Sequence, residues 1–123
     1  MKLFTVTVIV FALTALLLPS APARAHVRLD HASPAVGSTV AAAPKELVLW
    51  FTETVEPAFS SIEVRDTNGA AMHEGKAVVD PKQRTQMRVP LKLLVPGTYK
   101  VIWRVLSVDT HRTQGDFTFR VGP

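Results

Sequence analysis

Three residues of this 123-residue chain could together bind a transition metal: His26, Asp109 and His111. Asp109 and His111 are two positions apart, and in an extended chain side chains at that spacing point to the same side, close enough to share an ion. Taken alone, an Asp-x-His pair is more often a hydrogen-bonded pair in a loop. His26 is distant from both in sequence, and it has special chemistry only if it is the first residue of a processed chain.

A terminal His26 would have a free α-amine beside its imidazole, and the amine nitrogen and Nδ1 can close one chelate ring on a metal ion. With Asp109 and His111 it would offer an amine, two imidazoles and a carboxylate. Nitrogen and hard oxygen donors of this kind suit the tetragonal geometry of Cu(II) better than tetrahedral Zn(II). In the middle of a chain the same residue would be an ordinary surface histidine.

The first 25 residues have the features of a secretory signal peptide. Lys2 gives a positive start, residues 3–18 contain no charge, and the Ala-Arg-Ala that ends at Ala25 is the small-x-small pattern that signal peptidase reads. The apolar run is shorter than the roughly 20 residues that a membrane-spanning helix needs. We therefore expect a signal peptide over residues 1–25, and His26 at the start of the exported protein.

Cleavage after Ala25 would leave residues 26–123, which are 98 residues and enough for one small domain. Cleavage after Ala23 is the alternative, and it would leave Arg24 at the terminus. Two of the 14 basic residues, Lys2 and Arg24, leave with the signal peptide while all 10 acidic residues stay, so the formal net charge falls from +4 to +2. The remaining Lys and Arg residues form no run, which argues against nucleic-acid binding. The absence of cysteine excludes disulfides, thiolate zinc sites, iron–sulfur clusters and blue-copper sites.

Beyond residue 25, apolar and polar residues alternate with a period of two, and no stretch has a helical period. About seven short strands separated by turn signals predict an all-β fold, an antiparallel Greek-key β-sandwich or small barrel of the cupredoxin or immunoglobulin-like kind. Asn68-Gly69 is expected to supply the positive-φ positions of a hairpin turn. Because the termini and loops of a sandwich gather at its ends, His26 can meet Asp109 and His111 there. The predicted strands cover residues 27–30, 47–52, 61–65, 72–79, 86–89, 99–105 and 117–121, of which 72–79 is the weakest.

A series of short segments runs through the predicted mature chain. They are His26-Val-Arg-Leu with Ser33-Pro-Ala and Gly37, Leu49-Trp-Phe-Thr-Glu53, Pro96-Gly-Thr-Tyr-x-Val-x-Trp-Arg104, and Ser107-x-Asp-x-His111 running into Gly115-x-Phe-x-Phe119. In order and spacing these segments together resemble the CopC copper-resistance family. The resemblance covers nearly all of the predicted mature chain, and it implies a periplasmic or extracytoplasmic β-sandwich. It also implies that one Cu(II) per chain is bound by His26 and the Asp109-x-His111 pair.

Five further residues bear on metal binding. Glu53 resembles a family acidic residue that would orient the amine or a water from outside the coordination sphere, and a solvated carboxylate at a strand end is an equal alternative. Some relatives have a second, Cu(I) site in a methionine-rich loop with a histidine. Here the corresponding stretch has only Met72 and His73, while Met87 alternates like a core residue, so no strong Cu(I) site is expected. His31 has no evident partner and is expected at the surface.

The leading functional prediction is a soluble, monomeric copper carrier or buffer in copper resistance or homeostasis, without enzymatic activity. The resemblance implies that it hands copper to an inner-membrane transporter of the CopD type. An N-terminal histidine chelate with a second histidine also resembles the copper centre of polysaccharide monooxygenases. An oxidative enzyme is therefore the alternative, although a carboxylate on the metal leaves less room for oxygen. A third possibility is an immunoglobulin-like adhesion module without metal.

Overall fold

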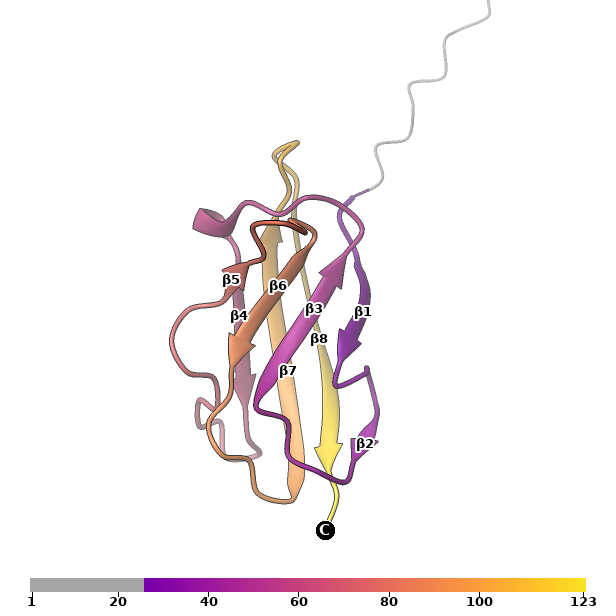
Figure 1. Cartoon of the computed structure of the whole chain (residues 1–123), viewed down its shortest axis with the longest axis vertical. Coiled ribbons are helices and arrows are strands. Elements are labelled where there is room, and N and C mark those ends of the chain that lie inside the picture. The colour runs from indigo at the N-terminus through magenta and orange to yellow at the C-terminus, as the bar shows by residue number, and fades with distance from the viewer. Residues whose placement is uncertain (1–25) are drawn as a thin grey trace, which may run out of the picture.

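The computed structural model describes residues 26–123, so the predicted signal peptide lies outside the described residues. Eight strands form two four-stranded sheets that pack face to face, with strand orders β1-β3-β6-β5 and β2-β8-β7-β4 (Figure 1). The predicted all-β sandwich is confirmed. Its elements are β1 (Leu29–Ser33), β2 (Thr39–Val40), β3 (Glu46–Phe51), the 3₁₀ turn η1 (Pro57–Phe59), β4 (Ser61–Arg65), β5 (Val78–Val79), β6 (Gln86–Pro90), β7 (Gly97–Leu106) and β8 (Arg112–Val121).

The predicted alternation fills the space between the sheets. Apolar residues of β3, β4, β6, β7 and β8 face inward and form one cluster, in which each is at most 8% exposed. Side chains at every second position of a strand lie on the same face, which is why the two-residue period identifies this core. The inward-facing set includes Leu47, Leu49, Phe51, Ile62, Val64, Met87, Val89, Tyr99, Val101, Trp103, Val105, Phe117, Phe119 and Val121.

The long hairpin of β7 and β8 is closely packed around Trp103. Its cross-strand partner is Gly115, and a Cβ atom at that glycine would lie 2.5 Å from a ring carbon of Trp103. The ring of Phe51 meets the Trp103 ring edge to face, with centroids 5.3 Å apart. A side chain at position 115 would clash with the indole, so glycine is required for this packing beneath the loop at the tip of the hairpin.

The strand count and one pairing differ from the prediction. β2 was not predicted, because two residues are too few to show alternation. It pairs with β8 in parallel, whereas all the other strand pairs are antiparallel. The weak strand predicted at 72–79 contains only β5 in regular pairing, and β5 belongs to the sheet opposite β4.

The turn after β4 also differs in detail. Gly69 has a positive φ of 79°, but Asn68 does not, so one of the two predicted left-handed positions is present. The carboxylate of Asp66 accepts hydrogen bonds from the N–H groups of Asn68 and Ala70, both at 2.9 Å. An aspartate that binds the backbone two residues on stabilises a turn by itself, which removes the need for a second left-handed residue.

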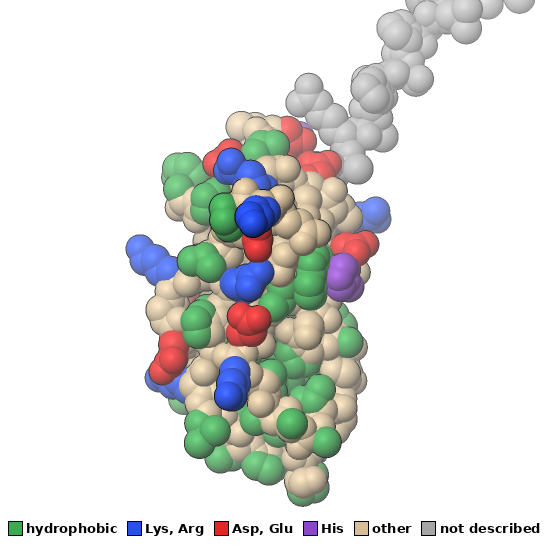
Figure 2. Space-filling model, in the orientation of Figure 1, with side chains coloured by type: hydrophobic (Ala, Val, Ile, Leu, Met, Phe, Trp, Pro, Cys, Tyr) green, Lys and Arg blue, Asp and Glu red, His purple; other side chains and the backbone are tan. Residues whose placement is uncertain are grey.

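The outward face of the β1-β3-β6-β5 sheet carries basic and acidic side chains interspersed with apolar ones (Figure 2). Arg88 and Asp80 form one ion pair there at 2.9 Å. Mixed charge of this kind leaves no continuous basic stripe on this face. Among the described residues the helical content is one three-residue turn, so none of it crosses a bilayer as a helix.

Candidate metal centre

The first residues of the described chain are fixed to both sheets. The side chain of Val27 is fully buried. Thr52, just after β3, accepts a hydrogen bond from Arg28 N–H through Oγ1, and its own N–H donates to Arg28 O, both at 2.9 Å. The hydroxyl of Thr113 on β8 donates to Val27 O at 2.9 Å. These contacts place His26 at the end of the sandwich, beside the start of β8.

The loop between β7 and β8 brings Asp109 and His111 together by turning, not by staying extended as predicted. Thr110 N–H donates to Ser107 O at 3.0 Å, and Thr110 has a φ of 73°, a left-handed conformation that non-glycine residues rarely adopt. The expectation that the pair shares one side of an extended chain is therefore wrong in mechanism. The proximity itself is present, because Asp109 Oδ2 lies 3.3 Å from His111 Nδ1.

The loop is attached to the chain that follows β3. Ser107 forms an isolated bridge with Val55, and Val108 N–H donates to Thr54 O at 3.2 Å. Ser107 N–H donates to His111 O at 3.0 Å, which closes the base of the loop. The same segment that holds the N-terminal residues through Thr52 therefore also holds this loop.

Ser107 positions the Asp109 carboxylate. It is 1% exposed, and its hydroxyl donates a hydrogen bond to Asp109 Oδ1. His111 N–H approaches the same oxygen at 3.4 Å. The loop thus holds Oδ1, and Oδ2 is left to face the His111 ring. The hydrogen bond from Ser107 is also the main reason that the pKa of Asp109 lies below its ordinary value of 3.8; partial desolvation opposes it, and the proximity of His111 adds to it.

His111 has an unused ring nitrogen. Its Nδ1 atom is buried and has no hydrogen-bond partner among the described residues, although Asp109 Oδ2 is within ion-pair distance. Buried polar atoms are nearly always paired, so an unpaired one indicates a missing ligand or water. Imidazole nitrogen and carboxylate oxygen bind metals at about 2.0–2.2 Å, which puts two adjacent donors about 3 Å apart. The 3.3 Å separation therefore suits two donors on one ion.

The His26 ring lies next to the ring of His111. Its centroid lies 5.0 Å from that of His111, and the two rings are nearly perpendicular at 86°. Residues 26–123 contain no group of three His, Asp or Glu side chains arranged to hold a metal ion. The side chains of His26, Asp109 and His111 are therefore not gathered as a three-ligand site in the described residues, and the α-amine would exist at His26 only after cleavage. The ligand set His26, Asp109 and His111 therefore stays a prediction.

Glu53 stays a prediction as well. It directly follows Thr52 and is half-buried. Within residues 26–123 its side chain makes no hydrogen bond or ion pair, so nothing links it to His26 or to Asp109. The sequence does not indicate which hydroxyl residues position the candidate ligands, because isolated Ser and Thr residues are common in strands and loops. In the structure they are Thr52, Ser107 and Thr113.

The other two histidines lie outside this centre. His31 is at the surface, as expected, with 58% of its side chain exposed, but it does have partners. Its ring stacks on Trp50 with centroids 4.3 Å apart, and Nδ1 lies 2.6 Å from Asp30 Oδ2. A β-bulge in β1 between Leu29 and His31 brings Asp30 into this group.

His73 is part of a structural contact. Its Nδ1 accepts a hydrogen bond from Val64 N–H at 3.0 Å. Met72 is half-buried against the core, and Met87 is fully buried within it. The prediction that Met87 is a core residue is confirmed, so it is not available as a surface sulfur ligand.

Comparisons with known proteins identify the family and agree with the fold. The sequence matches the family model of the CopC domain over residues 29–122. It is 40% identical to protein YobA of Escherichia coli K12, over 88% of this chain and 86% of that protein. It is also 40% identical to copper resistance protein C of Pseudomonas syringae pv. tomato, over 85% and 87% of the two chains. The crystal structure of CopC from Methylosinus trichosporium OB3b superimposes with a TM-score of 0.75 at 37% identity, covering 80% of this chain and 95% of that one.

Proposed function

Because this chain belongs to the CopC family, we propose that it is an exported Cu(II) carrier or buffer that acts in copper resistance or homeostasis. Copper is its cargo. The ligands in this proposal are the α-amine and imidazole of His26, the carboxylate of Asp109 and the imidazole of His111. The observation that carries the proposal is the buried Nδ1 of His111, which has no hydrogen-bond partner among the described residues and faces Asp109 Oδ2.

The donor chemistry favours Cu(II). An amine, two imidazoles and one carboxylate are borderline or hard donors, and Cu(II) is the most tightly bound of the first-row divalent ions at such sites. The hydrogen bond from Ser107 lowers the pKa of Asp109 and so favours its charged, metal-binding form. We propose one Cu(II) per chain, since His31 and His73 use their Nδ1 atoms in other contacts.

The site depends on processing of the N-terminus. In the uncleaved chain the nitrogen of His26 belongs to a peptide bond with Ala25, and an amide nitrogen is a far poorer donor than an amine. We propose cleavage after Ala25, a periplasmic or other extracytoplasmic location, a soluble monomeric product, and a CopD-type inner-membrane transporter as the recipient of copper.

The oxidative-enzyme alternative is less well supported. The named CopC relative is a copper resistance protein, which is not an enzyme name. Oδ2 of Asp109 faces the same position as His111 Nδ1, so it would occupy a coordination site that oxygen needs. Hydrogen peroxide production by the copper-loaded protein with a reductant separates the two functions, and we expect none above that of free copper.

The test of the proposal combines intact mass and copper titration of the protein purified from the periplasm of an expressing bacterium. We expect a mass that begins at His26 and one Cu(II) bound per chain. A variant with one extra residue between Ala25 and His26 keeps every side chain but displaces the amine, and it should lose more than about 100-fold in Cu(II) affinity, since even supporting groups around a metal contribute about 10- to 100-fold. A variant with one residue added after Pro123 is the control. Equal affinity of the N-terminally extended and native proteins would refute the ligand set.

A further inference from the structure

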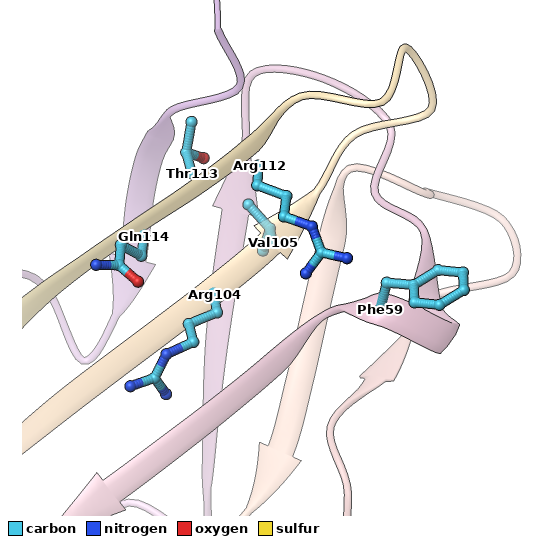
Figure 3. A pocket seen from close by; sticks show the side chains of 6 residues that line it. All are labelled: Phe59, Arg104, Val105, Arg112, Thr113 and Gln114. Carbon is cyan, nitrogen blue, oxygen red and sulfur yellow. The ribbon is translucent and has the colours of Figure 1, made fainter.

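A hollow of about 240 Å³ lies next to the loop that carries Asp109 and His111 (Figure 3). It is formed where β7 ends and β8 begins, with η1 on one side. The guanidinium of Arg112 extends toward the exposed ring of Phe59. The residues that line the hollow are Phe59, Arg104, Val105, Arg112, Thr113 and Gln114.

The charge of this hollow is strongly positive. Two of its six lining residues are arginines and none is acidic. The carboxylate of Glu63 lies 3.7 Å from Arg104, but it also lies 3.6 Å from Arg65, so one carboxylate serves two arginines. Arg112 has no ion pair with any residue from 26 to 123. Unneutralised guanidinium groups recognise carboxylates through paired hydrogen bonds.

The hollow continues along the sheet. A second hollow of about 360 Å³ shares Arg104 and Gln114 with the first, and it adds Lys100 and one acidic residue, Asp116. The two together follow the direction of β7 and β8. This elongated shape fits a chain lying along the strands better than it fits a single small anion.

Phe59 adds an apolar contact at the rim. It is 61% exposed, although a phenylalanine ring loses favourable burial energy in that position. Aromatic residues and arginines are the side chains that most often dominate binding at protein interfaces. Their combination beside a copper loop therefore favours a protein partner over a membrane surface, which would not need a concave site.

We propose that this basic hollow docks an acidic, extended segment of a partner protein, with carboxylates on Arg104 and Arg112 and an apolar side chain against Phe59. Arg112 directly follows His111, so a docked segment lies beside the proposed copper centre. The role of this docking in copper transfer rests on the proposed function, whereas the binding itself does not.

The experiment is a titration of the isotope-labelled, metal-free protein followed by NMR. The probe is a blocked Glu-Leu-Glu-Leu-Glu peptide, and the control peptide is Gln-Leu-Gln-Leu-Gln. We expect chemical-shift changes at Phe59, Arg104 and Arg112 with the acidic peptide, weakened by added salt because exposed charges are screened. Equal binding of both peptides, or changes centred elsewhere on the protein, would overturn the proposal.

Charge-matched variants sharpen the result. Arg104→Gln and Arg112→Gln should each weaken the acidic peptide about three- to tenfold, the range that an exposed to half-buried ion pair contributes. Arg84→Gln removes the same charge from an exposed residue outside the hollow, and it should change the affinity less than twofold. If Arg84→Gln weakens binding as much as Arg104→Gln does, the effect is general electrostatics and the site is refuted.

Two further measurements separate the alternatives. Vesicles of phosphatidylglycerol and phosphatidylcholine replace the peptide in one arm, and strong binding to vesicles without binding to the peptide would overturn the proposal in favour of a membrane surface. Cu(II) affinity is measured separately on Arg104→Gln, which should bind copper normally. If the native protein binds no Cu(II), the proposed function is refuted, and the result with the peptide is unaffected.

Discussion

His111 and His73 are both half-buried histidines next to a strand, yet their ring nitrogens differ in use. Nδ1 of His73 accepts a hydrogen bond from Val64 N–H at 3.0 Å, so this ring joins two segments of backbone. Nδ1 of His111 has no hydrogen-bond partner within the described residues and faces the Asp109 carboxylate. A metal at His73 Nδ1 must first break a hydrogen bond to the backbone. The neighbour of His111 Nδ1 is the Asp109 carboxylate, which is itself a proposed ligand.

The difference extends to the surroundings. Around His111 the chain places a second histidine ring at 5.0 Å and a carboxylate oxygen at 3.3 Å. His73 follows Met72 in the sequence, and Met72 packs on the core. Met87 is buried within the core. His111 is thus the better candidate ligand, because its Nδ1 atom lacks the hydrogen bond that His73 Nδ1 has.

The largest effect is expected when the unpaired imidazole is removed. His111→Ala deletes one proposed ligand and should weaken Cu(II) binding by more than about 100-fold, beyond the 10- to 100-fold loss that follows removal of groups supporting a metal ligand. His73→Ala removes a structural imidazole and should change Cu(II) affinity less than about twofold. Competition titration with a chromophoric chelator measures both.

His73→Ala should instead affect the fold. The N–H of Val64 loses its acceptor, and loss of a buried hydrogen bond costs about 1–3 kcal/mol in the free energy of unfolding. Urea denaturation of the copper-free protein measures this cost. If His73→Ala weakens copper binding as strongly as His111→Ala, the contrast between the two histidines is wrong.

A smaller effect is expected at the carboxylate. Asp109→Ala removes one oxygen donor but leaves the amine and both imidazoles, so Cu(II) affinity should fall about tenfold. The electron paramagnetic resonance spectrum of the copper-loaded variant should show a changed ligand set, because one oxygen is replaced by water. An unchanged spectrum together with unchanged affinity would place Asp109 outside the coordination sphere.

Thr113→Val tests the positioning of the N-terminal segment. The substitution keeps the shape of the side chain but removes the hydroxyl that donates to Val27 O. We expect a loss of about 1 kcal/mol in stability and a loss in Cu(II) affinity of about threefold to tenfold, because His26 becomes less well placed. Thr118→Val, on the exposed face of the same strand, is the matched control and should leave Cu(II) affinity unchanged.

Ser107→Ala should have the smallest effect on binding and a clear effect on titration. The Ser107 hydroxyl lowers the pKa of Asp109, so its removal should raise that pKa toward 3.8. A lowered folded-state pKa contributes stability above pH 3.8 that is lost as the pH falls through the folded value. Ser107→Ala should therefore be less stable at neutral pH and less sensitive to acid. Carboxyl NMR titration of the metal-free protein measures the pKa, and an unchanged value would remove Ser107 from this role.

The sequence predicts the core well because burial acts on side chains at every second position. Tyr99 to Val105 and Phe117 to Val121 alternate over long strands, so their inward faces are readable without any structure. β2 has only two residues, and its parallel pairing with β8 comes from the path of the chain, not from composition. Short edge strands therefore lie beyond what periodicity can indicate.

The sequence proposes residues for the candidate centre but not their geometry. Donor chemistry and resemblance single out His26, Asp109 and His111. Thr110, in its left-handed conformation, and Ser107, which donates to the Asp109 carboxylate, bring Asp109 to His111. This turn contains no glycine or proline from which it could be predicted. Long-range hydrogen bonds such as that from Thr113 to Val27, 86 residues apart, leave no pattern in a single sequence.

The docking of Val27 and Arg28 against Thr52 and Thr113 also bears on how the loaded protein unfolds. Positions 26 and 111 are 85 residues apart, so an ion held by both would close most of the chain into one loop. A crosslink across a long loop removes much of the disorder available to the unfolded chain, and a ligand that binds only the folded state adds stability in proportion to the logarithm of its concentration. In a domain without cysteine, copper would then serve as a reversible substitute for a disulfide, and release of the cargo would return the protein to its weaker, unlinked state.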